Sequence, residues 1–325
     1  MNWRTVLAAA VGAGLLIWLL LNAGLSSVIS SVVTLGLFGF VVLAVFQLGL
    51  AGIAGYAWAL LGSGRPDARL WPFVWSRLVR DAASQALPFT QVGGIALGGR
   101  ALALEGVAGH FAVASTLTDM AVEFTTQIAY AALGAGLLAD LRPASPFGRP
   151  VLALIAGLTL LAAGLVYAQS HGAHLVERLA RRLSGRQSED GEGLPIAEAL
   201  AAMRSRPWLV AGAWSLHLAA WVLTGVQTWI TLRLLHVDVS LGGALVVDSL
   251  TSAAKAVAFM IPGSLGIQEG ALVLLGQLFG VPPAAALALS LVRRGRDLAL
   301  ALPILGLWQL QHGARIWGQG EPKGG

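Results

Sequence analysis

The chain has 325 residues, of which 56% are hydrophobic and 11% are charged, and its mean hydropathy is +0.74. A soluble domain carries about 25% charged residues, so this composition excludes an ordinary soluble protein and predicts an all-α integral membrane protein. Cysteine is absent, which excludes a disulfide framework, a thiolate nucleophile and a cysteine metal site. The net charge of +5 comes from basic residues dispersed between apolar stretches, which indicates membrane topology rather than nucleic-acid binding.

Apolar stretches long enough to enter a membrane follow one another along the whole chain. A helix needs about 20 apolar residues to cross a bilayer. In chain order we expect membrane segments at residues 5–21, 32–61, 71–99, 111–139, 150–168, 208–235, 241–292 and 298–311. The first should remain uncleaved, because no clear small-residue cleavage site follows it. The second is long enough to tilt or to extend past the membrane, and the third is short, interrupted and charged.

The only substantial polar stretch covers residues 169–207 and is rich in arginine. Lysine and arginine outside the spans accumulate on the cytoplasmic side of a membrane protein. If the N-terminus lies inside, almost all of these residues fall on the inner side. The pattern therefore predicts that both termini and the basic loop 169–207 are cytoplasmic.

Two proline breaks interrupt the apolar stretches. The first contains Pro88, Gly93 and Gly94, and the second contains Pro262, Gly263 and Gly266. Each break is either a loop between two crossing helices or a re-entrant hairpin. The backbone of a re-entrant hairpin is tolerated only inside protein or beside water.

The two breaks belong to a predicted internal repeat. A shift of 174 positions places Pro88 on Pro262, residues 106–107 on the identical dipeptide at 280–281, and Glu123 on Asp297. The predicted units are residues 1–149 and residues 150–325, the second including the loop 169–207. Each unit would cross the membrane three times, so the units would be inverted relative to each other, with about 6 to 8 membrane segments in all. Inverted repeats with broken helices characterise many transporters.

Charged residues inside the apolar stretches form the candidate site. A charge at bilayer depth is costly and usually faces a partner or a cavity. The candidate residues are Arg77, Arg80, Asp81, Arg100, Asp119, Glu123, Asp248, Lys255, Glu269, Arg293, Arg294, Arg296 and Asp297. Two interpretations stay open: structural ion pairs that hold the units together, or a hydrophilic cavity that receives a charged or polar lipid headgroup.

Helical spacing adds two expectations about these charges. Asp119 and Glu123 are four residues apart and should share a helix face, and Arg293 should form an i,i+4 pair with Asp297. The cluster of Arg293, Arg294 and Arg296 needs anionic compensation, and the planar guanidinium group suits phosphate.

Motifs for catalysis and for metals are not found. No Gly-x-Ser-x-Gly elbow and no Walker A loop occurs in the sequence. His110, His217 and His312 are scattered, so we expect no histidine metal site and no cofactor. An enzymatic role is therefore not expected.

Three segments resemble a known family. They are Arg77-x-x-Arg80-Asp81 with Pro88, Gly93-Gly94 and Arg100; Pro262-Gly263-x-Leu265-Gly266-x-x-Glu269-Gly270; and Ser290-Leu291-x-Arg293-Arg294. Together they resemble the flippase-like transmembrane region of lysylphosphatidylglycerol synthases and its stand-alone relatives. Within that group the chain is most like the membrane proteins associated with hopanoid biosynthesis.

The resemblance implies a non-enzymatic protein of the bacterial inner membrane that moves or traffics a polar, anionic or hopanoid-type lipid. The full synthases add a soluble aminoacyl-transfer domain after this region, whereas this sequence ends at Gly325, so we do not expect it to charge lipids with lysine. The first break reads Pro88-Phe89 where relatives often have Pro-Gly, which leaves the geometry of that hairpin open.

Two other functions remain open. In one, the protein is a membrane-embedded isoprenoid or lipid transferase that binds a metal–diphosphate through Asp119 and Glu123. In the other, it is a scaffold that recruits lipid-biosynthetic enzymes through the loop 169–207.

Overall fold

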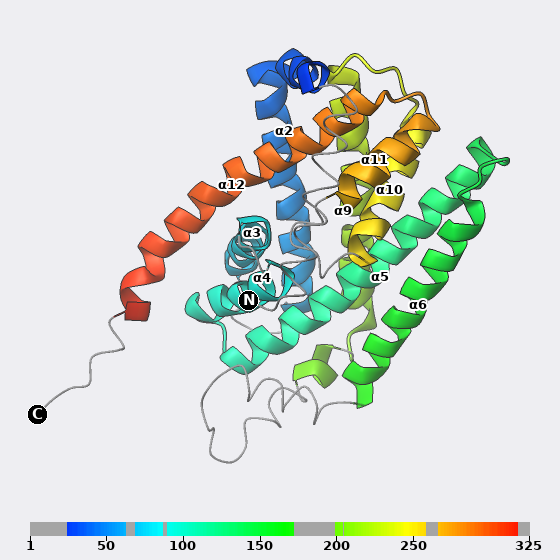
Figure 1. Cartoon of the computed structure of the whole chain (residues 1–325). Helices are drawn as coiled ribbons and strands as arrows, with labels where there is room; N and C mark the ends of the chain where they lie inside the picture. Colours follow the sequence, from blue (N-terminus) through cyan, green and yellow to red (C-terminus); the bar gives the residue numbers. More distant parts are fainter. Residues whose placement is uncertain are drawn as a thin grey trace, which may run out of the picture.

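The computed structural model describes residues 25–62, 69–86, 90–171, 199–203, 205–257 and 266–317, and every regular element in these ranges is a helix. The longer helices of Figure 1 are α2 (Leu25–Gly62), α3 (Leu70–Ala86), α4 (Thr90–Leu104), α5 (Gly109–Leu141), α6 (Gly148–His171), α9 (Pro207–Leu234), α10 (Leu241–Val257), α11 (Ile267–Gln277) and α12 (Pro283–Trp317). The predicted span 5–21, Pro88, Pro262, Gly263 and most of the loop 169–207 lie outside the described residues.

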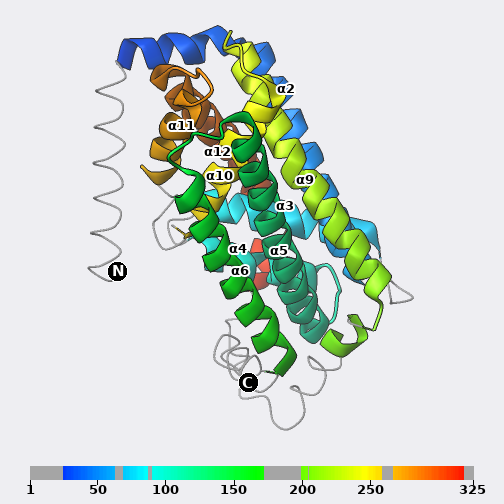
Figure 2. The same ribbon diagram turned by 90° about the vertical axis from the view of Figure 1, so that its right-hand side faces the viewer.

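Two of the described helices are long and apolar enough to cross a membrane. They cover Val33–Gly62 in α2, with a mean hydropathy of 2.3, and Pro207–Leu234 in α9, with a mean hydropathy of 1.5. The two helices pack side by side, as Figure 2 shows. Helices α5 and α12 have 33 and 35 residues, but charged side chains interrupt their apolar surfaces. The other expected spans stay predictions.

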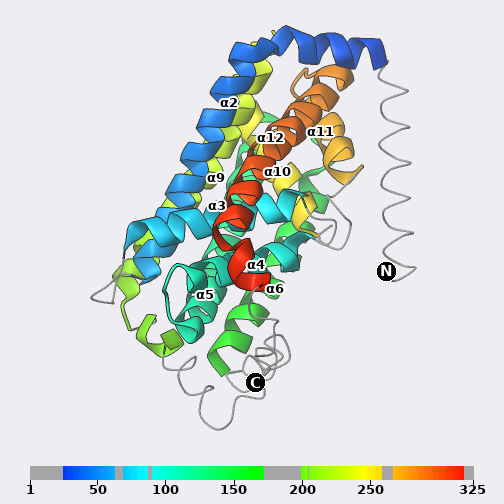
Figure 3. The same cartoon turned by 90° about the vertical axis from the view of Figure 1, so that its left-hand side faces the viewer.

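Helix α2 is divided by a kink at Gly36. This residue has φ 63° and ψ 173°, a conformation outside the helical region that is almost restricted to glycine. The segment before Gly36 lies across the end of the segment after it, as Figures 2 and 3 show. The expected segment 32–61 is therefore not one continuous tilted helix, because its first residues turn away at this glycine.

Two pairs of short helices form the regions of the proline breaks. Helix α3 packs along α4, and α10 packs along α11. Helix α11 has 11 residues, so at about 1.5 Å per residue it rises roughly 16 Å, about half of a bilayer core of about 30 Å. It starts after Gly266, whose φ is 76°.

Gly93 and Gly94 were expected in the first break, but both lie inside α4. For Gly94, the reason is its packing against α3. A Cβ added at Gly94 would lie 2.0 Å from the Oγ atom of Ser84 and 2.8 Å from the carbonyl oxygen of Arg80. The absence of a side chain at Gly94 thus lets the two helices approach closely.

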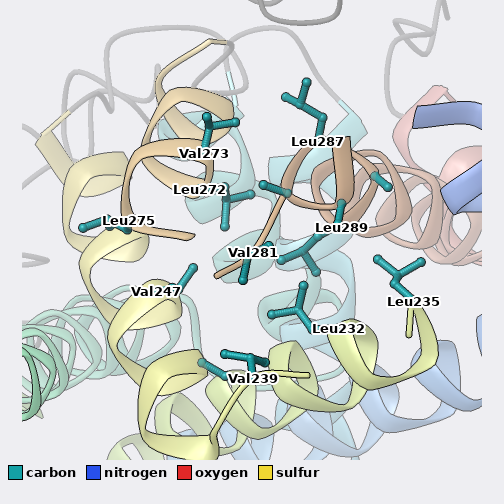
Figure 4. Close-up of a cluster of buried hydrophobic side chains, with 14 of the residues drawn as sticks. Leu232, Leu235, Val239, Val247, Leu272, Val273, Leu275, Val281, Leu287 and Leu289 are labelled. Carbon is teal, nitrogen blue, oxygen red and sulfur yellow. The ribbon is translucent and has the colours of Figure 1, made fainter. Parts of the chain in front are cut away.

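The largest apolar core lies where α9, α10, α11 and α12 meet (Figure 4). Leu232 of α9, Val247 of α10, Leu272 of α11 and Leu289 of α12 are each at most 1% exposed. A smaller apolar cluster joins α2, α3, α4 and α5. In it, the ring of Trp58 of α2 packs edge-to-face against the ring of Phe73 of α3. These two cores hold the helices that carry the candidate residues.

Helix α5 crosses α10 at a glycine. A Cβ added at Gly134 would lie 1.8 Å from Ser249 Oγ and 2.9 Å from Ser249 Cβ, so no larger residue fits while the helices keep this distance. On the exposed face of the same helix, Gly136 has no atom within 4 Å of an added Cβ. The pair offers a direct test of this crossing.

We expect Gly134→Ala to destabilise the protein by about 1–3 kcal/mol, because overpacking forces the helices apart. Gly136→Ala should be neutral or slightly stabilising, since alanine is the better helix former. Thermal unfolding in detergent measures both. Equal midpoints for the two variants would contradict the close approach of α5 and α10.

Candidate functional site

The predicted charged residues gather into two clusters, with Arg100 as the exception. The first charge cluster lies on α3 and α5 and comprises Arg77, Arg80, Asp81, Asp119 and Glu123. The second charge cluster lies on α10, α11 and α12 and comprises Asp248, Lys255, Glu269, Arg293, Arg294, Arg296 and Asp297. Arg100 is exposed on α4.

In the first charge cluster, two arginines of α3 hold carboxylates of α5. Arg77 donates to both oxygens of Glu123, at 2.9 and 2.6 Å, and through Nε to Asp81 at 2.9 Å. Arg80 donates to Asp119 Oδ2 at 2.8 Å and to Glu123 Oε2. Asp119 and Glu123 do share a helix face, as their spacing predicts, and that face is turned toward α3.

Burial in the first charge cluster decreases from Asp119 outward. The side chains of Asp119 and Arg80 are 0% and 5% exposed, whereas those of Glu123 and Asp81 are 24% and 36% exposed. The Arg80 guanidinium also lies over the ring of Trp58, 5.5 Å from the centroid, where a cation–π interaction helps to hold it. The cluster therefore has a closed inner end at Asp119 and an open end at Asp81.

His217 of α9 completes the inner end of the first charge cluster. Its Nε2 atom lies 2.9 Å from Asp119 Oδ1, and the residue is 2% exposed. The sequence suggests His217 only as a possible metal ligand, since no spacing relates it to Asp119, 98 positions away in the chain. Only its place inside an apolar stretch was a signal for a buried polar role.

In the second charge cluster, Asp248 of α10 is the best-satisfied acid. It accepts hydrogen bonds from Thr224 and Thr228 of α9, both at 2.8 Å, and from Tyr130 of α5 at 3.0 Å. Arg293 of α12 donates to the same carboxylate. Three helices thus converge on one buried aspartate that is 1% exposed.

The prediction that Arg293 forms an ion pair with Asp297 is wrong. Arg293 points across to Asp248, and Asp297 accepts two hydrogen bonds from the adjacent Arg296, at 2.9 and 2.7 Å. Arg296 also donates to Gln227 of α9 at 2.6 Å. Arg293 turns to α10 because the buried carboxylate of Asp248 would otherwise lack a counter-charge.

Glu269 holds the start of α11. Its Oε2 atom accepts the backbone N–H of Gly266 at 2.7 Å, and its Oε1 atom accepts from Ser290 at 2.7 Å and from Arg294 at 2.8 Å. The first contact is a helix-capping interaction. This residue was predicted to line a headgroup cavity, and its observed contacts are internal.

The two clusters carry opposite excess charges. In the first, two arginines face three carboxylates. In the second, each arginine has an acidic partner, whereas Lys255 has no hydrogen bond or ion pair with the described residues. Lys255 is half-buried and lies within electrostatic reach of Arg293, Arg294, Asp248 and Asp297. The surplus cation of the second charge cluster is therefore Lys255.

A cavity of about 500 Å³, apart from both charge clusters, lies beside the N-terminal end of α3. Trp71, Trp75, Glu105, Leu307 and Gln311 line it, and the rings of the two tryptophans stack with centroids 6.1 Å apart. Within the described ranges, no group of three or more His, Cys, Asp or Glu residues is placed to hold a metal ion. Asp119 and Glu123, proposed above for a metal–diphosphate, are instead bound by arginines.

We expect Arg80→Gln to destabilise the protein by about 3–5 kcal/mol, because it leaves buried carboxylates without their cation. Arg100→Gln is the matched control: it removes the same charge from an exposed position on the neighbouring helix, so its effect should stay within about 1 kcal/mol. Unfolding midpoints in detergent compare the two. A midpoint for Arg80→Gln as high as that of Arg100→Gln would mean that the first charge cluster does not hold the fold together.

Comparisons with known proteins place the chain in a family. No curated protein and no solved structure matches the chain. The family described as the lysylphosphatidylglycerol synthase TM region matches residues 5–304, which is nearly the whole sequence. The chain therefore belongs to the lysylphosphatidylglycerol synthase transmembrane-region family, and it is a membrane protein with a lipid-related function.

Proposed function

We propose that the protein translocates or traffics a polar lipid across or within the bacterial inner membrane, in a flippase-like manner and without changing it chemically. The observation that carries this proposal is the surplus cation of the second charge cluster, on Lys255. An unpaired charge among membrane helices is costly and marks a place where a ligand of opposite charge is stabilised. An anionic lipid headgroup is such a ligand, and the family has a lipid-related function.

The headgroup site on this proposal centres on Lys255 rather than on the three arginines. Arg293, Arg294 and Arg296 already have acidic partners, whereas Lys255 has none among the described residues. A lysine ammonium binds phosphate as a compact charge with three donors. Arg294, whose side chain is 28% exposed, adds positive potential next to the headgroup without leaving Glu269.

The inverted repeat is part of this proposal. The packing of the described helices supports it: α2 contacts α3 and α12, as α9 contacts α10 and α5. The hairpin of α3 and α4 meets α5, as the hairpin of α10 and α11 meets α12. On this reading α2, α3, α4 and α5 of residues 1–149 correspond to α9, α10, α11 and α12 of residues 150–325.

Each hairpin would be re-entrant rather than crossing twice. The short helices support this reading, since α4 has 15 residues and α11 has 11, below the roughly 20 needed for one crossing. The distribution of lysine and arginine supports cytoplasmic termini. A hopanoid-type lipid is one candidate substrate because, within the family, the chain most resembles the membrane proteins associated with hopanoid biosynthesis.

Leaflet exchange of labelled lipids in liposomes with the purified protein tests the function. Three lipids are compared: a phosphatidylglycerol, a phosphatidylcholine and a polar hopanoid. We expect protein-dependent exchange of the anionic lipid. Lys255→Gln should lower its exchange rate about tenfold, because a loss of roughly 1.4 kcal/mol of headgroup binding corresponds to a factor of ten.

Arg149→Gln is the matched control, because Arg149 is exposed at the start of α6, outside both clusters. Its exchange rate should equal that of the unmodified protein. Exchange by Lys255→Gln at the unmodified rate would reject Lys255 as the headgroup site. Exchange of none of the three lipids by folded protein would reject translocation.

A further inference from the structure

We infer that the His217–Asp119 pair at the inner end of the first charge cluster is a proton-binding site. The pair lies on α9 and α5, with His217 Nε2 at 2.9 Å from Asp119 Oδ1. Both residues are buried, at 2% and 0% exposed. The inference rests on this geometry and on the charge balance of the cluster, and it adds a second ligand to the protein, distinct from the lipid.

The charge balance leaves room for one proton. Asp81, Asp119 and Glu123 carry three negative charges, and Arg77 and Arg80 carry two positive charges. One negative charge is thus uncompensated in a largely buried network, where such a charge is costly. A proton on His217 makes the network neutral, and the imidazole is already in contact with the most buried acid.

The hydrogen bond also identifies the nitrogen that takes up the proton. A carboxylate accepts but does not donate, so the contact with Asp119 requires the hydrogen to be on Nε2 of His217. The neutral imidazole then has its lone pair on Nδ1. Proton uptake places the second hydrogen on Nδ1 and leaves the bond to Asp119 in place, which then joins a cation to an anion.

Several charged groups face His217 from the helices packed around it. Helix α5 presents Asp119 and Glu123, and Glu123 is within electrostatic reach of His217. Helix α3 places Arg77 and Arg80 behind these acids.

Within the described part of the chain, the other helices packed against α9 present no further charge to His217. Helix α2 carries no charged residue, and its Tyr56 is 46% exposed. Asp248 and Lys255 of α10 and the arginines of α12 belong to the second charge cluster. The charged groups nearest His217 among the described residues are therefore those of the first charge cluster.

The first charge cluster connects partly exposed acids to the buried histidine. The side chains of Asp81 and Glu123 are 36% and 24% exposed, whereas His217 is 2% exposed. From Asp81 the contacts run through Arg77 to Glu123, through Arg80 to Asp119, and on to His217. The two arginines keep their protons, so these contacts hold the acids and His217 in one network and do not relay a proton.

Nitrogen NMR of protein labelled with ¹⁵N-histidine, in lipid, tests the site directly and without any transport assay. An imidazole changes its charge between about pH 5 and 8, so the titration covers that range. We expect one histidine whose Nδ1 signal moves from the lone-pair to the protonated position, and whose signals vanish in His217→Gln. Glutamine preserves a donor to Asp119 and binds no proton.

His110→Gln is the matched control, since His110 is exposed near the start of α5, and it should remove a different signal. If His217→Gln does not fold, His217→Asn serves for the assignment. A His217 signal that stays unchanged over the whole range overturns the proton site.

Coupling of this proton to lipid movement rests on the proposed function and has its own readout. We expect the exchange rate of the unmodified protein and of His110→Gln to change with pH, and that of His217→Gln to lose this dependence. Titration of His217 without lipid exchange would keep the proton site and reject translocation. Exchange with the same pH dependence in His217→Gln would reject the coupling.

Discussion

Charged side chains among membrane helices must be satisfied by other protein groups, and this constraint decides which helices of the protein meet. A guanidinium or carboxylate taken out of water needs a counter-charge and further hydrogen bonds to be stable. The pairs Arg77–Glu123 and Arg80–Asp119 join α3 to α5, and Asp119 reaches α9 through His217. Arg293 and Arg294 of α12 reach α10 and α11 in the same way.

Close packing is the second requirement, because hydrogen bonds to a buried acid need short distances. Asp248 is reached from α9 by Thr224 and Thr228 and from α5 by Tyr130. A Cβ added at Gly225 would lie only 2.3 Å from the hydroxyl oxygen of Tyr130. The absence of a side chain at Gly225 therefore allows Tyr130 to reach Asp248. Glycine and threonine on these helices therefore serve the charged clusters as well as the helix packing.

The two clusters differ in the sign of their excess charge, and that difference separates their proposed roles. The first has one carboxylate more than its arginines neutralise, with a histidine at its buried end. The second has one lysine more than its acids neutralise. A proton suits the first and an anionic headgroup suits the second.

The sequence by itself determined the membrane class and the family, because apolar length is readable from composition and the family motifs from spacing. It also named the charged residues that, apart from Arg100, the structure gathers into two clusters. It also placed Asp119 and Glu123 on one helix face, since that relation is local. Tertiary structure decided the partners: Arg293 pairs with Asp248 instead of Asp297, Gly94 packs inside α4 instead of breaking it, and His217 joins Asp119 from 98 positions away. Helical periodicity describes neighbours within one helix, whereas these contacts form between helices, and their geometry exists only once the cores around them have packed.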